Sequence, residues 1–294
     1  MSHMSDEVAS QPTMWATAVE RAEQFAAALP PHGERLAVVG CGTSWHVANS
    51  YASLRESLGQ GETDAFATSE FPLGRRYDRV LLLSRSGTTS EVLTALEQLR
   101  GVVPTVAITA DAGSPIVDLA DALVVLDFAD ERSVVQTRFA TTTVALLRHH
   151  LGQDLQGVLT DGTRALGSEL PEGIVDAEQI TLLGTGWSYG LALEAALKLR
   201  ETAGLWAEAY PNQEYRHGPI SIAAPGRWTW LLGGSDPALV ADVERTGATV
   251  VVGELDPLAE LVRAQRVAHA IADHRGMDPD QPRNLSRSVI LPAH

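Results

Sequence analysis

The stretch Ile180–Ile222, ITLLGTGWSYGLALEAALKLRETAGLWAEAYPNQEYRHGPISI, decides the fold and also carries candidate chemistry. It opens as an apolar strand, passes through a glycine turn at 184–190, continues as a helix and ends in a polar loop. A strand, a tight turn and a helix in this order predict a βα unit of a parallel sheet. Lys198, Glu201 and His217 lie within it and are candidates for proton transfer.

The strand, turn and helix order of this stretch recurs along the chain. Short apolar runs that we expect to be strands lie at residues 35–39, 79–83, 105–109, 123–127, 179–183, 228–232 and 249–252. Strands that are apolar throughout and alternate with helices are typical of a parallel sheet covered on both faces. The glycine turns that open at Gly40 and Gly184 hold corresponding places, which indicates an internal duplication. We therefore predict two doubly wound α/β domains, over residues 1–160 and 161–294, with an N-terminal helix at 14–29. We also expect a helix at residues 115–120 and a polar, glycine-spotted boundary around residues 152–173.

The composition narrows the class of protein. A chain of 294 residues with 45% apolar residues can bury a core in each of two domains. Its formal charge of −15 argues against nucleic acid or an anionic membrane surface as a partner. Cys41 is the only cysteine, which excludes an intrachain disulfide and a cysteine-based zinc site. No apolar run could span a membrane and no signal pattern is present, so we expect a cytoplasmic protein in which residues 1–4 have no structural role.

A candidate anion-binding loop, Ser84–Ser90 (SRSGTTS), follows an apolar run and precedes a helix. Backbone N–H groups, hydroxyls and the helix dipole point at one spot in such a loop. The pattern predicts a phosphate site held by neutral donors and the helix dipole rather than by lysines. The alternative is an ordinary helix start, because Ser and Thr are preferred N-caps.

Two further features bear on this loop. Arg85 is either a solvated surface side chain or a partner of the phosphate, and the sequence leaves both interpretations open. Thr43 and Ser44 follow the preceding strand, whose end faces the same crevice in a doubly wound sheet. We therefore expect Thr43 and Ser44 to join the phosphate site.

A candidate acid–base set lies in the second half of the chain. Lys198 and Glu201 are three residues apart on one predicted helix, so they share a face. One interpretation is a solvated surface ion pair. The other is a partly buried carboxylate that acts as a base, which the apolar neighbours around Trp206 favour. His217 lies in a turn, where a histidine is either solvent-exposed or able to move a proton to a sugar ring oxygen.

These motifs together resemble the sugar-isomerase (SIS) domain family. LEAALKLRET with AEAYPNQEYRHGP is similar to the second SIS domain of the isomerase half of glucosamine-6-phosphate synthase, and SRSGTTSEV with GCGTS resembles the first. The resemblance extends to the tail DQPRNLSRSV. It implies two flavodoxin-like domains. The glutaminase half is not matched, so the resemblance does not imply glutamine-dependent synthesis.

The resemblance assigns a role to each candidate residue. Glu201 matches the base that moves a proton between C1 and C2 of the opened sugar, and Lys198 matches the lysine beside it. His217 matches a ring-opening histidine that the family takes from a neighbouring subunit, which implies a homodimer. The residues that match the family's phosphate loop are Ser44, Ser84, Ser86 and Thr89, with Arg85 in place of a glutamine. Val134 and Gln136 fall where the family contacts the sugar, the alternative being simple packing where a helix begins.

One departure concerns the tail. In DQPRNLSRSV the related synthase has a lysine at the position of Arg287, and that lysine forms a Schiff base with the ketose. A guanidinium, with a pKa above about 12, is not a neutral amine nucleophile, so this covalent step is excluded at Arg287. Arg287 remains a candidate for electrostatic binding of the sugar or its phosphate.

The sequence therefore predicts an isomerase or deaminase of a hexose or aminohexose 6-phosphate. Proton transfer between neighbouring carbons needs a base and a ring-opening acid, so we expect neither a metal nor a nucleotide cofactor. Two alternatives are a deglycase of phosphorylated fructosamines and a non-catalytic sensor of sugar phosphates. The presence of Lys198, Glu201 and His217 together argues against the sensor.

Overall fold

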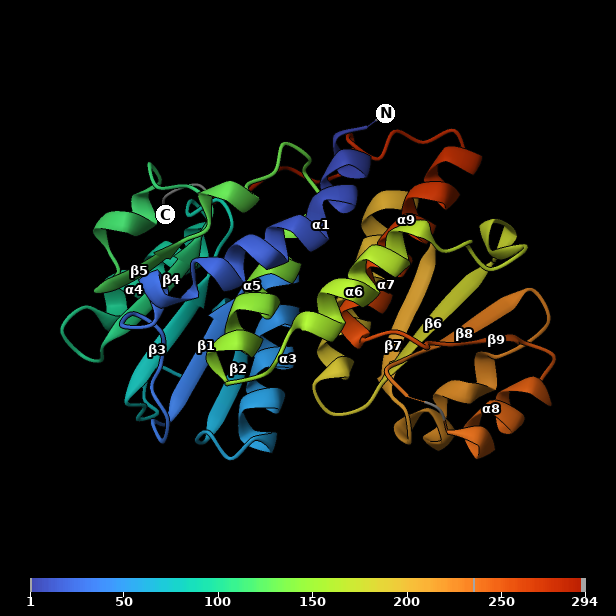
Figure 1. The fold of residues 1–294 in the computed structure, drawn as a ribbon, viewed down its shortest axis with the longest axis horizontal. Coiled ribbons are helices and arrows are strands. Elements are labelled where there is room, and N and C mark those ends of the chain that lie inside the picture. The colour runs from blue at the N-terminus through green and yellow to red at the C-terminus, as the bar shows by residue number, and fades with distance from the viewer. Residues whose placement is uncertain (1, 235, 292–294) are drawn as a thin grey trace. The chain divides into compact units, whose positions relative to one another are not determined.

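The computed structural model describes residues 2–234 and 236–291 (Figure 1). The chain forms two compact units, and each unit combines segments that are far apart in the sequence. The first unit contains residues 13–155 with the tail from Ser286, and the second contains residues 156–285 with the chain up to Pro12. The expected domain boundary between residues 160 and 161 stays a prediction. The compact units differ from that expectation in where both ends of the chain belong.

The first unit is built on a five-stranded sheet. Its strands are β1 (Leu36–Gly40), β2 (Thr63–Ala67), β3 (Arg79–Leu83), β4 (Thr105–Thr109) and β5 (Ala122–Val125). Every neighbouring pair is parallel and the order is β2-β1-β3-β4-β5, which is the flavodoxin-like arrangement. In the register of β1 and β3, Gly40 lies opposite Leu83, so the loops that follow these strands leave the same edge of the sheet.

Helices of the first unit cover both faces of this sheet, as the apolar strands require (Figure 1). They are α2 (Ala22–Phe25), α3 (Thr43–Ser57), α4 (Ser90–Leu99) and α5 (Arg138–His150), with 3-10 turns η1 (Thr68–Glu70), η2 (Pro115–Asp118) and η3 (Asp127–Ala129).

The first helix of the chain, α1 (His3–Glu20), begins earlier than the expected start at residue 14. Met4 belongs to the second unit and is fully buried. The expectation that residues 1–4 have no structural role is therefore wrong for Met4, while Met1 lies outside the described residues.

The second unit repeats the first with one strand fewer. Its strands are β6 (Gln179–Gly184), β7 (Trp206–Pro211), β8 (Arg227–Leu232) and β9 (Thr249–Val252). They are parallel in the order β7-β6-β8-β9, which matches the first four strands of the first unit. The helices are α6 (Gln156–Gly167), α7 (Ser188–Ala203), α8 (Pro237–Glu244) and α9 (Pro257–His274), with 3-10 turns η4 (Ile174–Asp176), η5 (Glu214–His217) and η6 (Pro219–Ile222). The internal duplication is therefore visible in the topology.

Four elements differ from the sequence-based expectation. The strands β2 and β7 were not anticipated, because both are edge strands with polar residues among the apolar ones. The helix α6 occupies a segment expected to be a polar linker. The run Pro115–Ala120, expected to be a helix, forms only the 3-10 turn η2.

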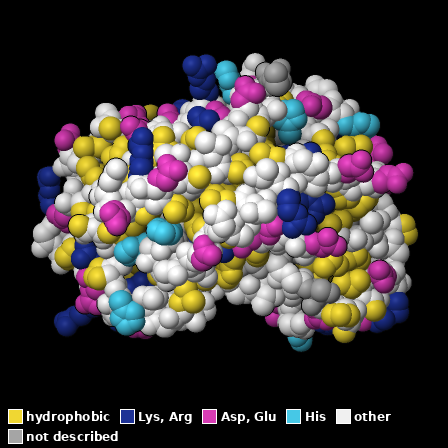
Figure 2. Space-filling view, in the orientation of Figure 1, with side chains coloured by type: hydrophobic (Ala, Val, Ile, Leu, Met, Phe, Trp, Pro, Cys, Tyr) yellow, Lys and Arg dark blue, Asp and Glu magenta, His cyan; other side chains and the backbone are white. Residues whose placement is uncertain are grey.

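The distribution of charged side chains on the surface and the character of the helices agree with what the composition indicated. Lys and Arg side chains are scattered among Asp and Glu on the face drawn in Figure 2, without a single basic patch. Within residues 2–234 and 236–291, no helix is both long and apolar enough to cross a lipid bilayer.

Candidate functional site

The phosphate-loop candidate, Ser84–Thr89, connects the end of β3 to the first turn of α4. Its fold depends on Gly87, which has φ of +61°. A Cβ at Gly87 would lie 2.0 Å from the Ser114 hydroxyl, far inside van der Waals contact. The Gly87 carbonyl accepts a hydrogen bond from the Ile116 backbone N–H at 3.2 Å. The loop is thus held against the segment after β4, and only glycine fits there without displacement.

Hydroxyls gather on this loop. Ser84 Oγ and Thr89 Oγ1 are 3.5 Å apart, and Ser86 Oγ lies 3.1 Å from Thr88 Oγ1. Thr89 is the N-cap of α4 and its side chain makes no capping bond, so ordinary capping does not account for the hydroxyls. Neutral donors at a helix N-terminus favour an anion through the helix dipole.

The other predicted ligands of the first domain lie nearby at the same sheet edge. Thr43 and Ser44 form the first turn of α3, immediately after β1, and both are buried. They line one small pocket together with Gln136 and Leu83, the last residue of β3. Gln136 Oε1 is buried without a hydrogen-bond partner among the described residues. The structure therefore brings Thr43, Ser44 and Gln136 together beside the phosphate loop, with one buried carboxamide oxygen that has no partner among the described residues.

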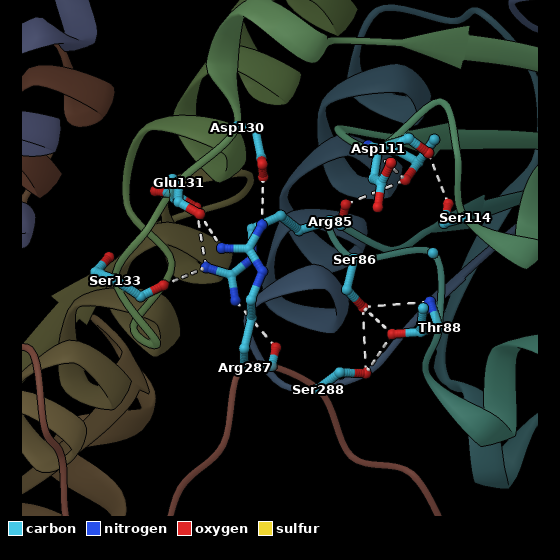
Figure 3. A network of polar contacts seen from close by, with 12 residues as sticks. Arg85, Ser86, Thr88, Asp111, Ser114, Asp130, Glu131, Ser133, Arg287 and Ser288 are labelled. Atoms are coloured by element: carbon cyan, nitrogen blue, oxygen red, sulfur yellow. Dashed lines mark hydrogen bonds and ion pairs between the residues drawn. The ribbon is translucent and has the colours of Figure 1, made fainter.

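Arg85 is not a surface residue. Its side chain is 1% exposed, and the guanidinium lies in the network of Figure 3. It donates to Glu131 Oε2 at 3.2 Å and to the carbonyls of Ser133 and Val134 at 3.1 Å each. A further bond reaches the Arg287 carbonyl at 3.0 Å. The solvated-surface interpretation is wrong, and the guanidinium is engaged by protein oxygens rather than presented to a ligand.

The C-terminal tail lies against the phosphate loop of the same unit (Figure 3). Arg287 forms an ion pair with Asp130 at 2.6 Å and donates to the Glu131 carbonyl. Ser288 Oγ is 2.9 Å from Thr88 Oγ1 and 3.2 Å from Ser86 Oγ. The tail is thus fixed by polar contacts.

The side chains at the apolar end of the tail are exposed rather than buried in a core. Val289, Ile290 and Leu291 are 53%, 72% and 49% exposed. Their backbone makes the contacts instead, since the Val289 carbonyl accepts from Ser90 N–H and Leu291 N–H donates to Ser90 Oγ.

The acid–base candidates lie on α7. Lys198 Nζ is 2.5 Å from Glu201 Oε2 and 3.3 Å from Glu194 Oε1. The side chains of Lys198 and Glu194 are fully buried, and that of Glu201 is 19% exposed. Burial alone would lower the pKa of Lys198, but the two carboxylates outweigh burial and raise that pKa above its ordinary value. The interpretation as a solvated surface pair is therefore wrong, and Lys198 is a buried cation.

Glu194 was missed by the sequence reasoning. It precedes Lys198 by four residues, a spacing that places both on one helix face, and this spacing was a usable signal. Lys198 is also the only lysine of the sequence. Glu131, Thr88 and Ser288 were missed as well, and no local pattern joins Glu131 or Ser288 to the loop, because 46 and 202 residues separate these partners.

His217 is the last residue of η5 and is exposed. The turn is anchored by Tyr215, which is 1% exposed, and by Arg216, which pairs with Asp242 at 2.6 Å. Gly218, with φ of +136°, reverses the chain after it. Over the part of the chain that the structure describes, no hydrogen bond joins His217 to Lys198 or Glu201.

Among residues 2–234 and 236–291, no group of three or more His, Cys, Asp or Glu side chains is arranged to hold a metal ion.

The chain is similar in sequence and in structure to known proteins. The chain is 32% identical to glutamine–fructose-6-phosphate aminotransferase (isomerizing) of Gloeobacter violaceus, over 88% of this chain and 52% of the relative. It spans about half the length of the curated relatives it matches. Glucosamine-6-phosphate deaminase of Thermotoga maritima has a similar structure, with a TM-score of 0.82, 24% identity and coverage of 99% of this chain and 100% of that one.

A second similar structure is tagatose-6-phosphate ketose/aldose isomerase of Escherichia coli. Its TM-score is 0.81 at 19% identity, covering 99% of this chain and 96% of that one. The family model described as the SIS domain matches residues 32–148 and 173–231, which take in the phosphate loop and all of α7. With two parallel sheets related by duplication, a hydroxyl-rich loop after β3 and this match over more than half of its length, the chain belongs to the SIS domain family.

Proposed function

We propose that this chain is a sugar-phosphate isomerase or amino-sugar-phosphate deaminase that acts on a hexose or aminohexose 6-phosphate. The observation that carries the proposal is the arrangement on α7, where a buried, charged lysine holds a carboxylate that is itself partly open to solvent. The hydroxyl-rich loop after β3 supports a phosphate ester as the handle of the substrate. The Thermotoga and Escherichia proteins of similar structure are named for this class of chemistry.

Glu201 is the proposed base. An ionised carboxylate takes a proton from one carbon next to the carbonyl of the open sugar and returns it to the neighbouring carbon. Lys198 orients this carboxylate through the 2.5 Å contact, and Glu194 holds Lys198 from the other side. The resulting enediol or enolamine is the shared intermediate of isomerisation and of nitrogen loss, so one base serves both reactions.

His217 is the proposed ring-opening residue. Its exposure leaves the imidazole accessible to a ligand, and an imidazole exchanges protons near neutral pH. The proposal includes a homodimer in which His217 serves the site of the partner subunit. Ring opening through an imine at the tail position is not part of it, because Arg287 carries a guanidinium that is paired with Asp130.

The phosphate and sugar ligands are proposed from the first unit. The hydroxyl ligands are Ser44, Ser84, Ser86 and Thr89, with Thr43 beside them. Gln136 offers its unpaired Oε1 to a sugar hydroxyl or an amino group. Val134 is proposed to contact the sugar, since it lies two residues before Gln136. Its carbonyl accepts a hydrogen bond from Arg85. Arg85 and Arg287 are proposed to support the site rather than to contact the phosphate.

The test is turnover with glucosamine 6-phosphate, galactosamine 6-phosphate, fructose 6-phosphate and tagatose 6-phosphate, following ammonia release and sugar interconversion. We expect one substrate to be converted, and Glu201→Gln to lower kcat by about a thousandfold or more while KM changes little, since a general base acts in the transition state. Glu244→Gln, an exposed residue of α8, is the matched control. Conversion unaffected by Glu201→Gln would refute the assignment.

Two other outcomes identify the alternatives. Release of an amino acid from a phosphorylated fructosamine, without ammonia from any aminohexose phosphate, would show a deglycase. Thermal stabilisation by a sugar phosphate with no turnover of any substrate would show a sensor. Either result would refute the proposed isomerase or deaminase.

A further inference from the structure

Three segments far apart in the sequence meet at one buried guanidinium. Arg85 belongs to the phosphate loop, its partner Glu131 lies 46 residues later, and Arg287 is in the tail. Both side chains of the Arg85–Glu131 pair are shielded from solvent, with exposures of 1% and 0%. A buried ion pair of this kind is held in one geometry, because breaking it leaves an uncompensated charge.

Glu131 is fixed from its other side as well. Its Oε1 accepts from the backbone N–H of Thr137 at 2.6 Å and of Arg138 at 2.7 Å, and from the Thr137 hydroxyl at 2.9 Å. Glu131 thereby holds the first turn of α5 while its Oε2 holds Arg85. Arg85 thus connects the phosphate loop to a rigid point of the fold.

The tail is held at Arg287 from two directions. Its carbonyl accepts from Arg85, and its guanidinium pairs with Asp130 and donates to the Glu131 carbonyl. The backbone of Arg287 is therefore tied to the phosphate loop, and its side chain is tied to the segment that holds Asp130 and Glu131 (Figure 3). The next residue, Ser288, is carried onto the hydroxyls of Ser86 and Thr88.

The consequence is a cluster of three hydroxyls from two segments. Ser288 Oγ lies 2.9 Å from Thr88 Oγ1 and 3.2 Å from Ser86 Oγ, and the latter two are 3.1 Å apart. The dianion of a phosphate monoester offers only acceptors, so each hydroxyl can turn its hydrogen towards it, because a hydroxyl rotates to suit its partner.

We propose that Arg85 is a positioning residue that seats the tail on the phosphate loop, and that Ser288 thereby becomes a phosphate-binding residue. This inference rests on the proposed function for the identity of the ligand. Arg85 acts through the tail and does not contact the phosphate, while Ser288 contacts it directly. The tail is thus a structural part of the phosphate site of the first unit.

The first experiment measures the position of the tail without any substrate. Hydrogen exchange of the amides of residues 286–291 is expected to accelerate about tenfold or more in Arg85→Gln, since loss of the anchoring bonds lets the tail open locally. Arg79→Gln is the matched control, because Arg79 begins β3, the strand that leads into the phosphate loop, and pairs with Glu34 at a partly exposed position. Arg85→Gln/Glu131→Gln removes both charges and gives a second variant free of an unpaired buried carboxylate. Tail exchange equal to that of Arg79→Gln in both variants would overturn the positioning role.

The second experiment measures ligand binding by calorimetry with inorganic phosphate and with fructose 6-phosphate. Ser288→Ala is expected to weaken phosphate binding by about tenfold, the effect of one hydrogen bond to a charged group. Hydrogen exchange of the tail should accelerate less than in Arg85→Gln, because the contacts of Arg287 remain. Ser286→Ala, whose hydroxyl donates to the Ser288 carbonyl within the tail, is the control. Wild-type affinity in Ser288→Ala would overturn the binding role. If no hexose 6-phosphate is turned over, the proposed function fails, whereas tail exchange and inorganic phosphate affinity still decide this inference.

Discussion

Lys198 illustrates how one residue sets the chemistry of its surroundings. Its pKa is raised above the ordinary 10.5, although burial works in the opposite direction, because Glu194 and Glu201 stabilise the charged form. The folded protein therefore binds this proton more tightly than the unfolded chain does. The resulting contribution to stability is complete below the unfolded-state pKa of 10.5 and disappears as the pH rises through the folded-state pKa.

We predict that Glu194→Gln destabilises the second unit by about 3 kcal/mol at pH 7, because it removes one partner of a buried ion pair. Glu194→Gln should also shift the alkaline loss of stability to lower pH. One carboxylate fewer then opposes the effect of burial, which lowers the pKa of Lys198. Urea unfolding at neutral and at alkaline pH measures both effects. Glu244→Gln, exposed at the end of α8, should change stability by less than about 0.5 kcal/mol. Equal unfolding midpoints for the two variants would contradict the prediction.

For single residues, the sequence predicted which side chains are candidates for the site better than it predicted their burial and their contacts. Helical spacing was enough to pair Lys198 with Glu201, and it would have added Glu194. It could not show that Lys198 is buried, which depends on the packing of α7 against β6 and α9. The role of Arg85 was out of reach for the same reason, because its partners come from segments 46 to 202 residues away.

At the scale of elements, the loop between β3 and α4 depends on one glycine. Gly87 has a positive φ and no room for a Cβ beside Ser114. Gly101 is a natural comparison, since it also has a positive φ, of +72°, but nothing lies within 4 Å of its missing Cβ. An alanine at Gly101 therefore tests the effect of the backbone conformation alone, whereas an alanine at Gly87 tests that effect together with steric crowding.

We predict that Gly87→Ala weakens fructose 6-phosphate binding by about tenfold or more, because the loop must move away from Ser114 in addition to adopting a left-handed conformation that costs about 1–2 kcal/mol. Gly101→Ala should lower stability only by the cost of that conformation and leave the affinity unchanged. Calorimetry and thermal unfolding together give the comparison. Unchanged affinity in Gly87→Ala would show that the loop geometry is not needed for the ligand.

The elements themselves were largely predictable where they are apolar throughout. The strands β3, β4 and β9 begin and end where the sequence analysis placed them. The strands β2 and β7 escaped it, because polar residues among their apolar ones interrupt the apolar run that marks a buried strand. Hydrophobic patterning therefore locates strands that are apolar throughout, including the edge strand β9, and misses strands with a mixed sequence.

At the scale of the whole molecule, both ends of the chain belong to the unit that is distant in sequence. The chain up to Pro12 packs with residues 156–285, where Met4 is buried and Gln11 donates to Gln265 at 2.7 Å. The tail from Ser286 belongs with residues 13–155. Sequence order alone predicts contiguous domains, so this exchange of termini was not foreseeable from composition or periodicity.

The proposed dimer has its own test at this scale. If His217 serves the site of a partner subunit, inactive Glu201→Gln and His217→Asn proteins should regain activity when they are mixed and allowed to exchange subunits. In a mixed dimer one site receives both wild-type residues, so about one quarter of the wild-type activity is expected at equal amounts, by counting the sites of randomly assorted dimers. Sedimentation checks the dimer itself. No recovery in a mixture shown to contain mixed dimers would place His217 in the site of its own chain.

The burial of Lys198 has a consequence for chemical labelling. Because it is the only lysine of the sequence and is fully buried, the folded chain presents no lysine amine to an acylating reagent. Each acylated Lys198 reports an opening of the region around α7. The rate of labelling therefore measures local unfolding of the second unit. A ligand that stabilises α7 would slow the same signal, which makes this single amine an internal reporter of binding that requires no engineered probe.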